Sequence, residues 1–213
     1  MTYLVAFDMD GTLLTINSSW EFIHRILGTV EVASAYRDMY ERGEISYRRW
    51  AELDVSTWRD KDFSRVLREV ERLELTENAK EAVSRLRDAG FITGLISSGL
   101  DVVADRVCRE LEMDFCRSAK LEIVDQRVVG ISEELAPDEK ALVLLEVSEE
   151  FGAPLDRVAF VGDGDSDLSV FRMGIGMKIA FRPESPLIRE LAHYVVDDLL
   201  DAADILIGWK GSE

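Results

Sequence analysis

The chain has 213 residues, of which 47% are hydrophobic and 31% charged, and its formal net charge at pH 7 is −17. This length and composition suffice for one large domain, or for a core domain with a modest insert, and they argue against disorder as the main state. The negative charge argues against nucleic acid and anionic membranes as partners, because both are bound through basic patches.

The N-terminal apolar stretch does not resemble a signal peptide. No basic segment precedes it, and Asp8 and Asp10 interrupt it. The chain also lacks a run of about 18 apolar residues, the length that a membrane-spanning helix needs. We therefore expect a cytoplasmic protein.

The two cysteines and two histidines show no metal-binding spacing. Cys108 and Cys116 form no CxxC pair and lie far from His24 and His193 in the sequence. We expect both cysteines to be buried or half-buried thiols that pack against their neighbours. We expect the histidines to be structural or surface residues.

Short apolar runs predict the strands. A continuous run such as residues 3–7 is typical of a strand that is buried on both faces of a parallel sheet. Residues 121–131 have the pattern of a hairpin with its turn near Asp125-Gln126. Further buried strands are predicted at residues 91–96, 158–161, 177–181 and 194–196.

Helical patterns lie between these strands. Residues 79–86 carry the apolar face of one helix, which Gly90 is suited to end. A second helix is predicted over residues 102–111, and a third runs from an N-cap at Asp138 to residue 151. Strand and helix in repeated order predict right-handed crossovers and an α/β fold with a doubly wound parallel sheet.

Residues 15–75 have a different character, because helical spacing occurs there without any strand-like run. Apolar residues repeat at helical spacing over 20–27 and again over 66–73, whereas 50–62 is too polar for a prediction. The simplest organisation is a helical insert, residues 15–75, in a core built from residues 1–14 and 76–213.

Polar clusters follow three of the predicted strands. Asp8 and Asp10 follow the first strand, Ser97 follows the second, and Asp163 and Asp167 follow a third. Ligands of an open α/β sheet bind beyond the carboxyl ends of its strands, so we expect these side chains to converge. Four carboxylates at one point repel each other, and Mg²⁺ is the natural cation to lie between them.

The same clusters resemble the motifs of the haloacid-dehalogenase-like (HAD) superfamily. Asp8-Met9-Asp10-Gly11-Thr12 is similar to its first motif, DxDGT, and Ile96-Ser97-Ser98-Gly99 to its second. Lys140 resembles the third motif, and residues 162–167 resemble the acidic fourth. The insert resembles the helical cap of phosphoserine-phosphatase-like members. The resemblance implies a Rossmann-like core with a small helical cap.

The resemblance also implies a role for each motif residue. Asp8 is expected to attack phosphorus and form an aspartyl-phosphate, and Asp10 to act as general acid and then as general base. Mg²⁺ is expected to be held by Asp8, the backbone carbonyl of Asp10, and Asp163, with Asp167 acting directly or through water. The residues expected to bind phosphate are Gly11, Ser97, Ser98 and Lys140.

The substrate side departs from phosphoserine phosphatase. That family has a Glu for the substrate amino group shortly after the first motif, where this chain has Asn17, with Glu21 four residues later. It also has a cap Arg for the substrate carboxylate, where this chain has Glu52 and Asp54. The sequence therefore does not assign phosphoserine as the substrate.

Other residues of the insert are candidates for substrate contact. Arg48 and Arg49 lie close to the position of that cap Arg in the sequence, although a solvated surface position is the favoured alternative for both. Trp20, Trp50 and Trp58 are candidates for an apolar pocket wall, and packing within the core or cap is the favoured alternative. With Asn17, the two arginines complete the predicted substrate side.

We therefore expect a Mg²⁺-dependent phosphatase that acts on a small phosphorylated metabolite, as a monomer or homodimer. A phosphotransferase or phosphomutase of the same superfamily is the enzymatic alternative, and Asp10 favours hydrolysis over it. A catalytically idle module that binds phosphate or metal is a further alternative, but no catalytic position of the motifs has been lost.

Overall fold

The computed structural model describes residues 2–212, in which seven strands form one sheet of order β4-β3-β2-β1-β5-β6-β7. The strands are β1 (Tyr3–Phe7), β2 (Phe91–Leu100), β3 (Phe115–Val124), β4 (Arg127–Glu133), β5 (Val158–Gly162), β6 (Met177–Phe181) and β7 (Tyr194–Val196). The helices are α1 (Ser19–Leu27), α2 (Val30–Glu41), α3 (Tyr47–Ser56), α4 (Ser64–Val70), α5 (Ala79–Asp88), α6 (Asp101–Leu111), α7 (Lys140–Glu150), α8 (Leu168–Phe171), α9 (Pro186–Leu191) and α10 (Leu199–Lys210).

The central strand β1 is buried along its whole length because helices cover both faces of the sheet. Tyr3, Val5 and Phe7 point into a core shared with α5, α6 and α10, whereas Leu4 and Ala6 point into a core shared with α7, α8 and α9. Successive side chains of a strand alternate between the two faces, which explains why the apolar run is continuous. All strand pairs are parallel except β3–β4. The predicted doubly wound α/β fold is confirmed.

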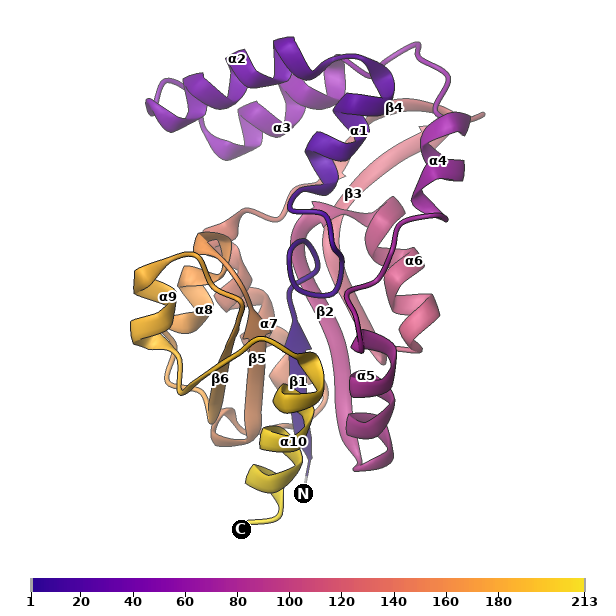
Figure 1. The fold of residues 1–213 in the computed structure, drawn as a ribbon. Helices are drawn as coiled ribbons and strands as arrows, with labels where there is room; N and C mark the ends of the chain where they lie inside the picture. Colours follow the sequence, from indigo (N-terminus) through magenta and orange to yellow (C-terminus); the bar gives the residue numbers. More distant parts are fainter. Residues whose placement is uncertain (1, 213) are drawn as a thin grey trace.

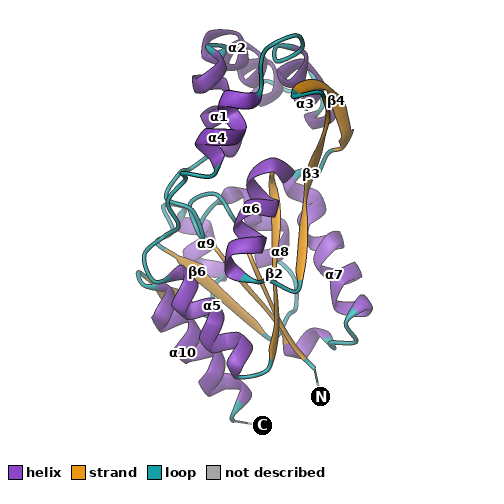
Figure 2. Cartoon of the chain, turned by 90° about the vertical axis from the view of Figure 1, so that its right-hand side faces the viewer, coloured by secondary structure: helices purple, strands orange, loops and turns teal. Residues whose placement is uncertain are grey.

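Helices α1 to α4 form a separate layer beyond the carboxyl end of the sheet (Figure 1). The β3–β4 hairpin extends from the sheet up to this layer, and its far end lies beside the helices (Figures 1 and 2). The turn of the hairpin contacts the loop between α3 and α4. Gln126 O accepts a hydrogen bond from Phe63 N at 3.0 Å, and Arg127 donates to Asp60 O at 2.6 Å. The hairpin, which the sequence division placed in the core, therefore also supports the helical layer.

Several element boundaries differ from the prediction. The expected N-cap at Asp138 is wrong: this residue lies inside a short 3₁₀ turn, Pro137–Glu139, and α7 begins at Lys140. Pro137 explains the earlier start, since its fixed φ suits the first turn of a helix. Strand β2 continues past residue 96, the hairpin starts before 121, and α4 ends before 73. The polar segment 50–62, left without a prediction, contains seven of the ten residues of α3.

The expectation of two free thiols is also wrong. Cys108 near the end of α6 and Cys116 in β3 form a disulfide, and their Cα atoms lie 6.3 Å apart. The sequence separation of eight residues gave no indication of this pairing, because only the turn from helix to strand brings the two residues together. Within residues 2–212, no helix combines the length and hydropathy needed to cross a bilayer.

Candidate active site

The carboxyl ends of β1, β2 and β5 meet beneath the helical layer. Asp8 follows β1 directly, and its backbone N–H donates to Val161 O of β5 at 2.9 Å. The side chain of Asp8 is nearly inaccessible, with 3% of the residue exposed. On the other side, β2 pairs with β1 only as far as Leu95, so Ser97 extends past the end of β1 toward the same point. The geometry thus brings the first, second and fourth motifs together.

The side chain of Lys140 extends from the start of α7 to the carboxyl edge of the sheet. Its Nζ donates to Asp8 Oδ1 at 2.8 Å and to Asp167 Oδ1 at 2.7 Å, and only 1% of the residue is exposed. Burial alone lowers the pKa of Lys140, but the charges of Asp167 and Asp8 outweigh it and raise the pKa above its ordinary value. Lys140 is therefore a fixed positive charge beside Asp8.

Asp8, Asp163 and Asp167 form a compact cluster of carboxylates. Each offers one oxygen such that all three atoms lie within 4.8 Å of one another. Burial, followed by the charge of Asp8, raises the pKa of Asp163 to about 7, although a hydrogen bond from Thr12 Oγ1 opposes the shift. Burial and Asp8 also raise the pKa of Asp167. Mutually repelling oxygen ligands at this spacing fit a hard cation such as Mg²⁺.

Asp167 also organises the loop after β5. Its Oδ2 accepts hydrogen bonds from the backbone N–H groups of Asp163 at 3.1 Å and Gly164 at 3.4 Å. Its Oδ1 is the atom that contacts Lys140. Because both oxygens have protein partners, Asp167 positions Asp163 and Lys140 in addition to its place in the cluster.

Gly11 is required by the geometry of the first motif. Its φ is +77°, a left-handed conformation that favours glycine, and a Cβ atom there would collide with the carboxylate of Asp163. Glycine is therefore needed at position 11 for two reasons: the backbone conformation and the space that the Asp163 carboxylate occupies.

Asp10 is the acidic residue that faces the helical layer. Its Oδ2 accepts hydrogen bonds from the backbone N and the Oγ of Ser19, both at 2.8 Å, whereas its buried Oδ1 has no partner within residues 2–212. Burial raises the pKa of Asp10 to about 6, with the charge of Asp8 adding to the shift and the Ser19 hydrogen bonds opposing it. A carboxyl group with a free oxygen and this pKa can both give and accept a proton near neutral pH.

The second motif connects the core to the helical layer. Ser97 Oγ accepts a hydrogen bond from Gly99 N at 3.0 Å. The carbonyl oxygen of Ser98 accepts one bond from Trp20 Nε1 at 3.0 Å and another from Tyr47 Oη at 3.3 Å. The hydroxyl of Ser98 is buried and has no partner in the described part of the chain.

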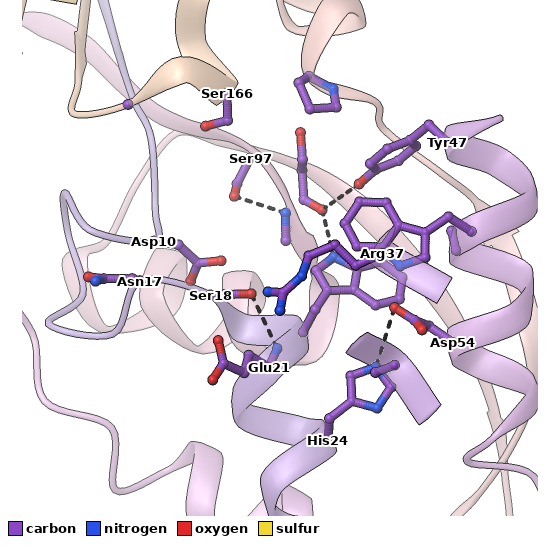
Figure 3. Close-up of a pocket in the computed structure, with 18 of the residues that line it drawn as sticks. Asp10, Asn17, Ser18, Glu21, His24, Arg37, Tyr47, Asp54, Ser97 and Ser166 are labelled. Atoms are coloured by element: carbon purple, nitrogen blue, oxygen red, sulfur yellow. Dashed lines mark hydrogen bonds and ion pairs between the residues drawn. The ribbon is translucent and has the colours of Figure 1, made fainter. Parts of the chain in front are cut away.

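A cavity of about 480 Å³ lies between the two layers, directly over this cluster. The core contributes the motif residues to its floor, and the helical layer contributes its roof (Figure 3). The roof includes Asn17, Trp20, Glu21, His24, Arg37, Tyr47, Trp50 and Asp54. The fully buried Trp58 packs in the core instead, as the favoured alternative expected.

Of the three residues predicted for the substrate side, only one lines the cavity. Asn17 lines the cavity, but Arg48 and Arg49 are not among its lining residues; both are exposed and pair with Glu52. The arginine of the helical layer that does reach into the cavity is Arg37 of α2 (Figure 3). No sequence signal singled out Arg37, because only the packing of α2 against α3 brings it over the site.

A doubly wound sheet that carries an aspartate cluster and a buried lysine at its carboxyl edge, under a helical cap, defines a hydrolase core of the HAD type. Comparison with known families agrees: the model of the haloacid dehalogenase-like hydrolases matches residues 5–172. The chain belongs to this family. We refer to α1–α4 and their loops, residues 15–75, as the cap.

Individual relatives are phosphoserine phosphatases. The enzyme of Methanocaldococcus jannaschii is 26% identical over 196 residues, which cover 91% of this chain and 92% of the relative. The enzyme of Streptococcus thermophilus is 30% identical over 213 aligned positions, 95% of each chain. The enzyme of Archaeoglobus fulgidus is 32% identical over 187 residues, but this chain spans only 54% of its length.

Solved structures show the same likeness. A phospho-aspartyl intermediate analogue of a phosphoserine phosphatase superposes with a TM-score of 0.77 and 26% identity, covering 92% of this chain and 94% of that one. A substrate-bound phosphoserine phosphatase complex gives a TM-score of 0.80 at 25% identity, covering 96% and 97%. The predicted HAD-like phosphatase class and its likeness to phosphoserine phosphatases are confirmed.

Proposed function

We propose that this chain is a Mg²⁺-dependent phosphatase that hydrolyses a small phosphomonoester through an aspartyl-phosphate on Asp8. The observation that carries the proposal is the arrangement around Asp8. One of its oxygens is held by Lys140 at 2.8 Å, Asp163 and Asp167 lie beside it, and a cavity opens directly above it. The related structure of a phospho-aspartyl analogue supports the same chemistry.

Two steps with Asp8 and Asp10 account for the reaction. In the first, a carboxylate oxygen of Asp8 bonds to phosphorus, the bond from phosphorus to the ester oxygen breaks, and Asp10 donates its proton to the departing alcohol. In the second, water attacks the phosphorus, Asp10 takes its proton, and Asp8 is released with inorganic phosphate. The free Oδ1 of Asp10 is suited to both transfers.

The carboxylate cluster is the proposed magnesium site. Asp8, Asp163 and the backbone carbonyl of Asp10 would hold the ion, with Asp167 supporting them. Bound there, Mg²⁺ would neutralise the carboxylates and the phosphate oxygens, and thereby let the anionic substrate approach. The raised pKa of Asp163, caused first by burial and then by Asp8, supports a need for positive charge at this point.

The phosphate itself would be held by the second and third motifs. The ammonium group of Lys140 reduces the repulsion between Asp8 and the incoming phosphate, and it stabilises charge on the transferring phosphoryl group. Ser97 and Ser98 would donate their hydroxyls, and Gly11 would allow close backbone approach. The partly enclosed cavity limits access of bulk water during transfer.

Hydrolysis is favoured over transfer to a second substrate because Asp10 can activate water. The partner is then a small phosphorylated metabolite. Phosphoserine is the second candidate substrate, since the relatives from Methanocaldococcus jannaschii and Streptococcus thermophilus are phosphoserine phosphatases. Four expectations stay predictions from the sequence: that nucleic acid is not a partner, that anionic membranes are not a partner, that the protein is a monomer or homodimer, and that it is cytoplasmic.

A generic assay tests the proposed function. With para-nitrophenyl phosphate as substrate, we expect turnover with Mg²⁺, loss of turnover with a chelator, and recovery when Mg²⁺ is restored. Asp8→Asn is expected to abolish turnover while the far-ultraviolet circular dichroism stays unchanged. Asp165→Asn, a matched change at an exposed residue of the same edge, is expected to retain it. Full activity of Asp8→Asn contradicts the proposal.

A further inference from the structure

The roof of the cavity contains a buried acidic residue that forms no ion pair with a lysine or arginine of residues 2–212. Asp54 on α3 is 2% exposed and lines the cavity. Its carboxylate lies beside the His24 ring (Figure 3). The distance from Oδ2 to His24 Nε2 is 3.3 Å, but neither Nε2 nor Asp54 Oδ1 forms a hydrogen bond within residues 2–212. An acceptor that is buried without a donor is costly unless a ligand supplies the missing bond.

The neighbours of His24 fix which nitrogen carries its proton. His24 Nδ1 lies 3.1 Å from Trp58 Nε1 and 2.7 Å from Thr29 Oγ1. An indole N–H can only donate, so Nδ1 accepts and the imidazole is neutral, with its proton on Nε2. That proton faces Asp54. The neutral ring lies beside the carboxylate without a hydrogen bond to it, and Asp54, which lines the cavity, keeps Oδ1 as an acceptor without a donor.

Two further polar groups of the cavity wall lack protein partners. Trp50 Nε1 is a buried donor, and Ser98 Oγ is a buried hydroxyl that can both donate and accept. Arg37 also lines the cavity, and no hydrogen bond or ion pair engages its guanidinium group within the described range. The wall therefore offers an unused acceptor together with unused donors.

Aromatic surface separates these polar groups. Trp20, Tyr47 and Trp50 all line the cavity, and the first two are fixed by their hydrogen bonds to Ser98 O. Indole and phenol rings present apolar faces with a polar edge. Such walls accommodate the C–H faces of a sugar or polyol between the groups that bind its hydroxyls.

We propose that the cap pocket selects a polyhydroxylated leaving group, so that the substrate is a sugar phosphate or polyol phosphate, with one hydroxyl donating to Asp54 Oδ1. This inference rests on the proposed phosphatase function and names the substrate class of the same site. A hydroxyl both donates and accepts, and it therefore satisfies Asp54, Trp50 and Ser98 without adding a charge to the pocket.

Other leaving groups fit these walls less well. A carboxylate, as in phosphoserine, would meet one cation of the roof, Arg37, but two carboxylates, Asp54 and Glu21, which repel it. An ammonium group would suit Asp54, but it would leave Trp50 Nε1 unpaired because it cannot accept a hydrogen bond. The cavity of about 480 Å³ also leaves room for a group larger than a short amino acid.

Steady-state kinetics on a defined panel tests the inference. The panel consists of sorbitol phosphate, glucose phosphate, glycerol phosphate, phosphoserine, phosphoethanolamine and para-nitrophenyl phosphate, each with Mg²⁺. We expect kcat/KM for sorbitol or glucose phosphate to exceed that for phosphoserine and phosphoethanolamine at least about tenfold, because unpaired buried groups penalise the wrong ligand. Preference for phosphoserine or phosphoethanolamine overturns the inference and leaves the phosphatase proposal standing.

Two variants connect the preference to the pocket. In Asp54→Asn the amide oxygen is needed by His24 Nε2, so the NH₂ group faces the cavity and the acceptor is lost. We expect the ratio of kcat/KM for the best polyol phosphate to that for para-nitrophenyl phosphate to fall at least about tenfold. Trp50→Phe keeps an aromatic ring without the N–H, and it is expected to lower the same ratio severalfold even if Asp54→Asn does not fold.

Glu52→Gln is the matched control, since it removes the same charge from the same helix at a residue that pairs with Arg48 and Arg49. The ratio should be unchanged in this variant. An equal fall in Glu52→Gln, or an unchanged ratio in both Trp50→Phe and a folded Asp54→Asn, overturns the inference. If no phosphoester is turned over at all, including para-nitrophenyl phosphate, the phosphatase proposal fails and the inference fails with it.

Discussion

The floor and the roof of the cavity are built on different principles. In the floor, the central charges bind each other: Lys140 lies between Asp8 and Asp167, and Asp163 accepts from Thr12, so that only the atoms at its upper edge, Asp10 Oδ1 and Ser98 Oγ, lack partners among residues 2–212. In the roof, Asp54 Oδ1 and Trp50 Nε1 are buried and have no hydrogen-bond partner in the described part of the chain. Charged groups that are already held in place suit a fixed chemical step. Buried polar groups of the roof that lack a hydrogen-bond partner suit recognition of a ligand that supplies the missing bonds.

The largest expected effect comes from removing the central charge of the floor. Lys140→Met leaves Asp8 and Asp167 buried together without a cation. We expect kcat to fall by about a thousandfold, because a preorganised charge near the transferring group is lost. We also expect the free energy of unfolding to fall by about 3 kcal/mol, measured by urea titration, since a broken buried ion pair leaves unpaired charge.

Lys120→Met is the control for this change. Its ion pair with Glu133 lies on the surface, with 54% of the lysine side chain exposed. Surface pairs contribute little, so activity and unfolding free energy should stay near the original values. If both lysine variants behaved alike, the floor would not be the organised region described above.

The next effect comes from the glycine of the first motif. Gly11→Ala combines a left-handed φ of +77° with a collision against Asp163. Gly28→Ala has a similar φ of +67° but meets nothing within 4 Å. We expect both to lose about 1 kcal/mol of stability from backbone strain, whereas only Gly11→Ala should lose activity and raise the Mg²⁺ concentration needed for half-maximal turnover. Equal activity of the two variants contradicts the role of Gly11.

A pH experiment sharpens the role of Asp10, whose pKa is raised to about 6 mainly by burial. Formation of the aspartyl-phosphate needs protonated Asp10, so its rate should fall about tenfold per pH unit above the pKa. Hydrolysis of the intermediate needs ionised Asp10, so its rate should rise through the same range and then level off. Rapid-quench kinetics separate the two steps. Parallel pH dependence of both steps would contradict the assignment.

The smallest effect concerns the contact between floor and roof. Trp20→Phe removes the hydrogen bond from Nε1 to Ser98 O at 3.0 Å and keeps an aromatic ring. A single bond of this kind contributes about 1 kcal/mol, so we expect kcat/KM for para-nitrophenyl phosphate to fall severalfold. The control is Trp209→Phe in α10, where the indole ring packs against Tyr3 of β1. This variant should change kcat/KM little.

The floor was largely predictable from the sequence, whereas the roof was not. Asp8, Ser97 and Asp163 each follow a strand of a parallel sheet, and the topology of such a sheet brings those positions to one edge. The resemblance to the ordered HAD motifs supplied Lys140 as the third motif, because its position at the start of a helix gives no sign by itself that it is buried between carboxylates.

The roof depends on contacts between helices that have no fixed register in the sequence. His24 lies on α1 and Asp54 on α3, and their separation in the sequence does not indicate that the imidazole ring lies beside the carboxylate. Arg37 belongs to α2, whereas Arg48 and Arg49, the candidates that the sequence offered for substrate contact, face solvent and pair with Glu52, as the favoured alternative expected. The contact between the β3–β4 hairpin and the cap and the Cys108–Cys116 disulfide likewise follow from tertiary packing alone.

Chemical trapping of the intermediate tests the central claim most directly. The enzyme is mixed with Mg²⁺ and a phosphomonoester, quenched in acid, and reduced with borohydride, which converts an aspartyl-phosphate to homoserine. Peptide mass spectrometry is expected to find homoserine in place of Asp8 and unmodified aspartate at Asp10 and Asp163. Modification at another carboxylate, or none during active turnover, would contradict the account.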